Sequence, residues 1–495
     1  MTMQLFPTLT RSDYLLIALI FIFYFVITLP NLTGLPIFVD EAIYGRWSQI
    51  SLYDASWRFI SLTDGKQPLF MWIAMPFLKI INNPLFAIRL VSVLSGLGTI
   101  IAMWYAGFLT GGKRTAYWAA FFGTITPFLF FYNRFAVVGS MLTFFGVLIF
   151  CLSLIYHTKP RLDLALIIGI TIGLAMLVKS PAVIYLYLFP AGLITNHTSL
   201  QKRSSLLQYL GQYLLIFVLA QMIYNIQRLS PWMHIIIQKN NDFAVPIAEI
   251  LQDPIRLGKN IVNSTRWLLH YLTWPVAFTG LFGAYQLGKK NLKQTLHLSV
   301  WFLVPLAAEI AIASLYRSRY ILFVVPYFLL FVAYFVSRLE LKRSFLISLG
   351  LSIMPMFFII LAITSPLETP LLSDDADYTD GWASGNGVKE ISQYLTDEAR
   401  SAGGQQIIVG TEGTFGLLPH GLELYTYGLN NLTITGYWPL NEIPPQDLRA
   451  RESDENTIYF VLNNTQIDST PPGLEEILAY KKHDDSWIRL YRLIP

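Results

Sequence analysis

The chain has 495 residues, of which 54% are hydrophobic and only 13% are charged. This composition excludes an ordinary soluble domain and indicates a protein that crosses a bilayer many times. The net charge of +4 divides unevenly, because residues 1–364 carry 27 Lys/Arg and 11 Asp/Glu, a net charge of +16, whereas residues 365–495 carry a net charge of −12.

Apolar runs long enough to cross the hydrocarbon core divide residues 1–364 into about eleven predicted spans. They lie near residues 14–30, 84–110, 116–132, 137–156, 162–178, 181–195, 206–224, 267–286, 297–314, 320–337 and 345–364. Every second connection carries a basic cluster: Lys113-Arg114, Lys159 with Arg161, Lys202-Arg203, Lys289-Lys290 with Lys293, and Arg338 with Lys342-Arg343. By the positive-inside rule these connections are cytoplasmic, so the basic half does not indicate nucleic-acid binding. The single cysteine, Cys151, excludes an intramolecular disulfide.

This charge pattern predicts a cytoplasmic amino terminus and a first span that is retained rather than cleaved as a signal peptide. Residues 31–83, residues 225–266 and the tail then face the outer side of the membrane. Within 31–83 we expect two short helices at the interface, near 41–52 and 68–81. Three tryptophans are the expected headgroup anchors: Trp47, Trp57 and Trp72. An additional span at 68–81 is the alternative.

The acidic pair Asp40-Glu41 follows the first span in a half of the chain that has few carboxylates. Ionised carboxylates cannot face lipid, so the pair must meet water, a metal or cations. One of two adjacent residues can point to a substrate and abstract a proton from it, while the other serves the structure. The alternative is a solvated loop or a helix N-cap.

Lys66, in Asp64-Gly65-Lys66-Gln67-Pro68, is predicted to open a helix on the same outer face. It offers a cation and backbone donors to a lipid phosphate, although a snorkelling interfacial lysine has the same pattern. Further cations stand at the outward ends of spans, against the positive-inside bias: Arg89, Arg134, Lys179 and Arg319. An anionic substrate, phosphate above all, would explain the set, although each residue alone is more readily explained by a structural ion pair or an interface position. Glu309, inside a predicted span, is expected to balance one of these cations.

The tail begins after Pro366 and Pro370 and combines helical with strand-like patterns. Residues 387–395 have helical spacing, and strands are predicted at 406–410, 457–462 and 487–493. The predicted fold class is therefore mainly α: residues 1–364 form a polytopic helical domain, and residues 365–495 form a small α/β extracytoplasmic domain.

The order of these motifs resembles the GT-C membrane glycosyltransferases, in particular the protein O-mannosyltransferase and lipid A aminoarabinose transferase families. The residues that carry the resemblance are Val-Asp-Glu-Ala-x-Tyr-x-x-Trp at 39–47, Lys-x-Pro-Leu-Phe-x-Trp at 66–72, and Arg89 opening a long span. The first 200 residues match well, and the later spans match loosely, including Arg319-Tyr320 followed by Pro326.

The resemblance implies an inverting transfer from a polyprenyl-phosphate sugar donor to a protein or glycolipid acceptor. It implies Asp40 as the catalytic carboxylate, Glu41 as its motif partner and Lys66 as the lysine that meets the donor phosphate. Basic residues near that pocket match less closely: Arg89 and Lys179. A multi-pass protein of a prokaryotic plasma membrane is the expected setting, with the tail outside.

Two positions depart from those families. Gly139 stands where an Asp is frequent, and Gly65 stands where the aminoarabinose transferases carry an acidic residue before the lysine. A second outer carboxylate and a metal site of that kind are therefore not supported. No cofactor is predicted, and the need for a divalent metal stays open.

Two functions of other classes remain as alternatives. A polytopic lipid or solute transporter, or flippase, would also have many spans and charge within the membrane, although coupling residues tend to lie near the midplane and in repeated halves. No internal repeat is visible in this sequence, and Glu309 is the one acidic residue placed that way. A non-catalytic scaffold whose acidic outer domain binds partners is the third interpretation.

Overall fold

A computed structural model describes residues 7–195, 203–453, 456–463 and 470–494. It divides into two compact units. The helical unit comprises Met1–Pro30, Phe59–Phe70 and Val91–Thr364, and the mixed unit comprises Asn31–Arg58, Met71–Leu90 and Ser365–Pro495. Each unit is therefore built from separate stretches of chain. The boundary expected at residue 364 stays a prediction, but the structure adds parts of the first outer loop to the unit that holds the tail.

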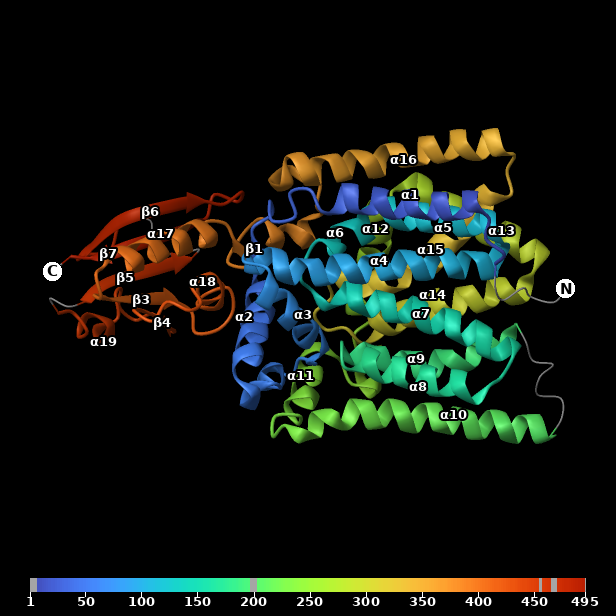
Figure 1. Cartoon of the computed structure of the whole chain (residues 1–495), viewed down its shortest axis with the longest axis horizontal. Coiled ribbons are helices and arrows are strands. Elements are labelled where there is room, and N and C mark those ends of the chain that lie inside the picture. Colours follow the sequence, from blue (N-terminus) through green and yellow to red (C-terminus); the bar gives the residue numbers. More distant parts are fainter. Residues whose placement is uncertain (1–6, 196–202, 454–455, 464–469, 495) are drawn as a thin grey trace. The chain divides into compact units, whose positions relative to one another are not determined.

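Seven helices among the described residues are long and apolar enough to cross a membrane. They contain α1 (Arg11–Thr28), α4 (Pro84–Gly111), α7 (Val138–Thr158), α10 (Arg203–Tyr224), α14 (Leu292–Ile312), the 3-10 turn Ser318–Val324 with α15 (Val325–Ser337), and α16 (Leu341–Thr364). In the helical unit they run in roughly one direction (Figure 1). The chain is a multi-pass membrane protein, as the sequence predicted. Lys202 of the predicted basic clusters lies outside the described residues.

The other predicted spans are short or interrupted. The span expected at 116–132 is broken into α5 (Lys113–Ile125) and α6 (Pro127–Asn133), because Pro127 has no N–H and disfavours a helical conformation at the residue before it. The span expected at 162–178 is the 15-residue α8 (Leu162–Met176), about 22 Å long.

The chain near residue 181 forms a series of short turns, and the chain near residue 270 bends. Residues 180–194 contain two 3-10 helices on either side of α9 (Ile184–Leu188). The prediction of one span at 267–286 is wrong, since α12 (Pro254–Tyr271) and α13 (Trp274–Lys290) are separate helices, and Thr273 between them has a φ of 67°. Helix α11 (Ile235–Phe243) lies in the predicted second outer loop.

The first outer loop contains two helices near the predicted positions, α2 (Val39–Tyr53) and α3 (Leu69–Ile80). With 12 residues, α3 is about 18 Å long, too short for the additional span that was the alternative. The expectation that Trp47 anchors α2 among lipid headgroups is wrong. Its side chain is only 2% exposed, and its ring packs 6.0 Å from the ring of Phe415 in the tail.

The first outer loop and the tail also share a small sheet within the mixed unit. Strand β1 (Ile37–Phe38) pairs antiparallel with β2 (Ser384–Gly385), and the Val39 amide donates to the Ala383 carbonyl at 3.0 Å. Helix α2 begins at the end of β1. The start of the helix that carries the acidic pair is therefore fixed by backbone hydrogen bonds to the tail.

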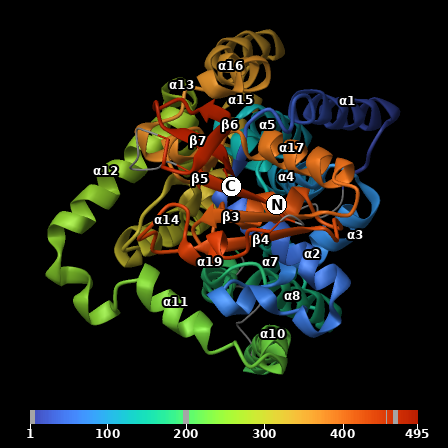
Figure 2. The same cartoon turned by 90° about the vertical axis from the view of Figure 1, so that its left-hand side faces the viewer.

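The tail forms a five-stranded sheet with helices on both faces, which confirms the predicted small α/β domain. The strand order is β4 (Leu432–Tyr437), β3 (Gln406–Glu412), β5 (Asn456–Asn463), β7 (Trp487–Leu493) and β6 (Leu474–Lys481), seen side by side in Figure 2. Strand β3 is parallel to β4 and to β5, and β7 is antiparallel to β5 and to β6.

Successive residues of β5 point to opposite faces of this sheet, and each face packs against a helix. The Tyr459 hydroxyl donates to Glu398 of α17 (Val388–Ser401) at 2.9 Å, whereas Phe460 is buried with Leu448 of α19 (Gln446–Arg449). The remaining helix of the tail is α18 (His420–Tyr425).

Candidate functional site

The two members of the acidic pair occupy different environments at the start of α2. Asp40, the second residue of the helix, is partly exposed, whereas Glu41 is fully buried. A Glu41 carboxylate oxygen accepts from the Phe38 amide at 3.0 Å, as an acidic residue in the first helical turn commonly does. Of these two adjacent residues, one is therefore partly accessible to solvent and the other is held inside the mixed unit, and their proposed tasks stay predictions.

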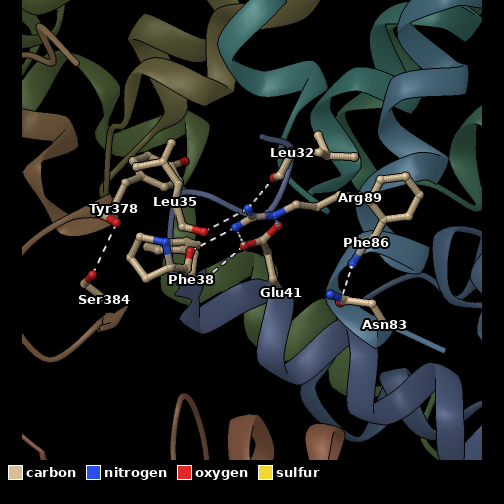
Figure 3. Close-up of polar contacts among 10 residues, drawn as sticks. Leu32, Leu35, Phe38, Glu41, Asn83, Phe86, Arg89, Tyr378 and Ser384 are labelled. Carbon is tan, nitrogen blue, oxygen red and sulfur yellow. Dashed lines mark hydrogen bonds and ion pairs between the residues drawn. The ribbon is translucent and has the colours of Figure 1, made fainter. Parts of the chain in front are cut away.

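The partner of Glu41 is Arg89, in the second turn of α4. Arg89 Nε donates to Glu41 Oε1 at 2.8 Å, and Nη2 donates to Oε2 at 2.7 Å, in the two-point geometry that suits guanidinium and carboxylate. Figure 3 shows the guanidinium held between this carboxylate and backbone carbonyls of the loop before β1. The two side chains are 1% and 0% exposed. Such a pair is strongly coupled, since removing either charge leaves the other buried without its partner.

The remaining N–H groups of Arg89 bind the loop that follows the first span. Nη1 donates to the carbonyls of Leu32 at 2.8 Å and Leu35 at 3.0 Å, and Nη2 donates to that of Pro36 at 2.9 Å. Together with the two bonds to Glu41, these contacts use all five donors of a guanidinium. Arg89 was expected to contact the donor phosphate, but its hydrogen bonds are made within the mixed unit.

Lys66 lies directly after a tight turn of the helical unit. The 3-10 helix Ile60–Asp64 ends at Gly65, whose φ of 66° is left-handed, and the Lys66 amide donates to the Ser61 carbonyl at 2.9 Å. The Lys66 ammonium lies 5.1 Å from the ring centre of Phe243, and Asp64 forms an ion pair with Lys239 at 3.0 Å. Helix α11 therefore covers the turn from which Lys66 projects.

Gly65 has two reasons to be glycine. Besides its left-handed φ, a Cβ at this position would lie 2.8 Å from Lys239 Cγ and 3.0 Å from the Ile235 carbonyl oxygen. An acidic side chain, which the aminoarabinose transferases carry at the matching position, has no room here.

Gly65→Ala is expected to lower the free energy of unfolding by about 2–4 kcal/mol, because backbone strain and steric overlap add. Gly112→Ala is the matched control in the same unit, since Gly112 also has a positive φ, of 87°, but a Cβ there would meet nothing within 4 Å among the described residues. Strain alone predicts a loss of about 1 kcal/mol there. Thermal melting of both variants in one detergent measures the difference, and equal losses would refute the role of crowding by α11.

The turn that carries Lys66 is bonded to the turn that carries Lys179. The Gln67 side-chain amide donates to Ser180 Oγ at 2.7 Å, and the Leu69 backbone amide donates to the Leu177 carbonyl at 3.0 Å. Two stretches of chain about 110 residues apart in sequence therefore meet beside these two lysines. This contact brings together two of the cations that the sequence singled out.

Lys179 is the centre of a cluster of charged groups in the helical unit. Its ammonium lies 4.2 Å from the ring centre of Tyr320, and the Arg319 guanidinium lies 5.8 Å from the same ring. Burial lowers the pKa of Lys179; the positive charges of Arg319 and Lys66 lower it further, and Glu309 opposes them. Lys179 is thus within electrostatic reach of both Lys66 and Arg319. We name Lys66, Lys179 and Arg319 the cation cluster.

Arg134 has a different environment. It is 3% exposed, and its Nη1 donates to the carbonyls of Thr28 at 2.7 Å and Pro30 at 2.9 Å, while its guanidinium lies 5.3 Å from the ring centre of Phe130. These contacts place a cation at the carboxy-terminal end of α1, where the helix dipole favours it. Arg134 therefore fixes the end of the first span.

Gly139 is the second position that departs from the family pattern. A Cβ at Gly139 would lie 3.3 Å from Leu322 and 3.8 Å from the Arg319 carbonyl oxygen, so this position borders the segment of the cation cluster but carries no carboxylate. Among the described residues, no group of three or more His, Cys, Asp or Glu side chains is arranged to hold a metal ion.

The architecture, a set of long apolar helices with a small carboxy-terminal sheet domain, is the fold of the GT-C membrane glycosyltransferases. Two structures of ArnT from Cupriavidus metallidurans have this fold, one in the apo state and one bound to undecaprenyl phosphate. Both are 14% identical to this chain; their TM-scores are 0.59 and 0.60, and the matches cover 97% and 98% of this chain and the same shares of theirs.

Residues 65–224 match the family described as dolichyl-phosphate-mannose-protein mannosyltransferase. This segment includes Lys66 and Lys179 but begins after the acidic pair. No curated protein matches the chain. The predicted resemblance to GT-C membrane glycosyltransferases, near the mannosyltransferase and aminoarabinose transferase families, is confirmed.

Proposed function

We propose that this protein is an inverting glycosyltransferase that moves a sugar from a polyprenyl-phosphate donor to a protein or glycolipid acceptor on the outer face of a prokaryotic plasma membrane. The observation that carries the proposal is the cation cluster, in which Lys66 and Lys179 belong to the segment that matches the mannosyltransferase family. The fold shared with ArnT, which has been solved with undecaprenyl phosphate, supports a lipid-linked donor. The amino terminus is cytoplasmic in this proposal, and the tail is outside.

The chemistry assigns a separate task to each group. Asp40 takes the proton of the acceptor hydroxyl as its oxygen attacks the anomeric carbon. The bond from that carbon to the phosphate oxygen breaks, and the polyprenyl phosphate leaves with the electron pair. Lys66, Lys179 and Arg319 stabilise the charge that grows on the phosphate. The product is inverted because one carboxylate acts as base and none acts as nucleophile.

The structure changes the tasks that we propose for the other predicted residues. Glu41 and Arg89 form the buried pair that fixes the start of α2, and so they position Asp40 rather than contact the donor. Arg134 holds the end of α1. The donor phosphate is left to the cation cluster.

Lys66→Ala is expected to raise the KM for the donor by roughly 10- to 100-fold, the effect of losing a charged hydrogen bond. Lys66→Arg should retain part of the affinity. Lys289→Ala is the control, because Lys289 also lies over an aromatic ring, 4.5 Å from the centre of Tyr285, but belongs to a predicted cytoplasmic cluster. Donor titrations with purified protein and a polyprenyl-phosphate sugar measure the effect. Equal KM values for the Lys66 and Lys289 variants would contradict the assignment.

A transporter or flippase remains the second candidate, and one observation favours it. Glu309 is 7% exposed within α14, a helix long and apolar enough to cross the membrane, and it opposes the lowering of the Lys179 pKa. Buried acidic residues inside membrane helices are typical of transport pathways. Counterflow in proteoliposomes tests this candidate. Lipid or solute exchange without formation of any glycosidic product would favour transport over transfer.

A further inference from the structure

The tail contains an open pocket whose lining residues all belong to the tail itself. Its volume is about 570 Å³. Its lining includes Tyr437, Trp438, Asn441, Glu442, Gln446 and Asp447. We name it the tail pocket. A space of this size accommodates a small organic ligand.

The position of the tail pocket in the sheet is one that suits ligand binding. Strands β3 and β4 are parallel and end in register, with Glu412 opposite Tyr437, and the pocket lies just beyond both carboxyl ends. Ligands of α/β sheets bind preferentially at this edge. The two strand ends approach closely, since a Cβ at Gly436 would lie 2.3 Å from the Gly413 carbonyl oxygen. The end of β4, paired with β3, therefore forms one wall of the pocket.

Two aromatic side chains, Tyr437 and Trp438, border the tail pocket. Trp438 is 66% exposed, so the face of its indole ring is available to a ligand. The Tyr437 hydroxyl is buried beside Asp447, and burial, the charge of Asp447 and a hydrogen bond to that carboxylate raise the pKa of Tyr437. The hydroxyl and this carboxylate therefore form one polar group at the border of the pocket.

The remaining lining, within the part of the chain that the structure describes, is rich in oxygen and amide groups, and its charged side chains are both acidic. Arg451 does not border the pocket, but its charge acts on Tyr437. Glu442 and Asp447 are acidic, and Asn441 and Gln446 supply amides; the Gln446 amide donates to Glu442 at 3.1 Å. Carboxylates accept hydrogen bonds from hydroxyl groups and repel phosphate or sulfate. An exposed aromatic face beside such acceptors suits a ring that has C–H groups on its face and hydroxyls on its rim. That description fits a neutral sugar.

We propose that the tail pocket binds a neutral sugar unit, stacked on Trp438 and hydrogen-bonded to Asp447 and the neighbouring amides. If the transfer function proposed above holds, this unit belongs to the acceptor, because the charged donor phosphate does not suit a pocket bordered by two carboxylates. The acceptor would then already carry a sugar at the moment of transfer.

The test uses the full chain in nanodiscs and saturation-transfer NMR. The probes are methyl α-mannopyranoside, methyl β-glucopyranoside, glucose 6-phosphate as the anionic analogue, and trilysine as a cationic peptide. Transfer to the ring protons of a neutral glycoside is expected, reduced at least five-fold by Trp438→Ala and by Asp447→Asn. Trp487→Ala is the control, because Trp487 is a 36% exposed tryptophan of β7, toward the other edge of the same sheet.

Every outcome of this test decides the proposal. The proposal is overturned if no neutral glycoside binds or if glycoside binding survives Trp438→Ala. It is also overturned if glucose 6-phosphate binds equally well or if trilysine is the probe that binds. Asp40→Asn should leave glycoside binding unchanged. If that variant also keeps full transfer activity, the transfer mechanism is wrong while the tail pocket stands. If Asp40-dependent transfer is found and no glycoside binds, the tail pocket is wrong and the transfer mechanism stands.

Discussion

Asp40→Asn is expected to lower the rate of sugar transfer by about a thousand-fold, within the range that a general base contributes. Asn has nearly the same size and can still accept a hydrogen bond, but it cannot take the acceptor's proton. Asp40 is partly exposed at the start of α2, so the substitution should leave the fold and the affinity for the donor intact. Single-turnover assays with a radiolabelled polyprenyl-phosphate sugar measure the rate.

Asp54→Asn is the control for that experiment. Asp54 lies at the other end of α2, where its carboxylate accepts hydrogen bonds from the Ser56 amide at 2.9 Å and the Ser56 hydroxyl at 2.6 Å. It has no task in the proposed reaction, so its variant should turn over normally. Comparable activity of the Asp40 and Asp54 variants would show that Asp40 is not the base.

Arg89→Met is expected to destabilise the mixed unit by about 3–5 kcal/mol, because it leaves the Glu41 carboxylate buried without its cation. For a unit of this size the melting temperature should fall by roughly 10 °C. Arg89→Lys should not restore stability, since an ammonium cannot reproduce the bonds to one carboxylate and three carbonyls. The double variant Glu41→Gln with Arg89→Met should be more stable than the sum of the single losses predicts.

Arg46→Met is the matched control for the buried pair. Arg46 is on α2, the same helix as Glu41, and its ion pair with Glu423 at 3.0 Å is partly solvated, with exposures of 19% and 25%. A pair of this kind contributes about 0–1 kcal/mol. Melting curves that show equal losses for the Arg46 and Arg89 variants would contradict the structural task assigned to Glu41 and Arg89.

Much of the fold could be predicted because membrane insertion imposes a simple composition rule. Apolar length identified the long helices, and short runs rich in apolar and β-branched residues identified the central strands β3, β5 and β7 of the tail. The breaks at Thr126 and Thr273 were missed, because hydropathy does not register where a backbone turns. Strands β4 and β6 were missed because they lie at the edges of the sheet, where one side is exposed and the apolar pattern is weak.

The charged residues of the candidate site could be selected from the sequence, but the side chains that they contact could not. Charge placement singled out Asp40, Glu41 and the outward cations, and their roles stay predictions; the structure adds that Glu41 is buried and that the charges of Lys66 and Arg319 act on Lys179. The pairing of Glu41 with Arg89 joins residues 48 apart and depends on burial, which one sequence does not display. The packing of α11 over Gly65 is likewise a long-range contact, and its one sequence signal was a glycine before the lysine.

The most direct test of the proposed function is to incubate the purified protein with radiolabelled polyprenyl-phosphate sugars and a membrane extract that supplies acceptors. The proposed mechanism predicts release of polyprenyl phosphate together with a labelled product whose anomeric configuration is inverted, and loss of both with Asp40→Asn. Retention of configuration, or exchange of lipid across the bilayer with no labelled product, would contradict it.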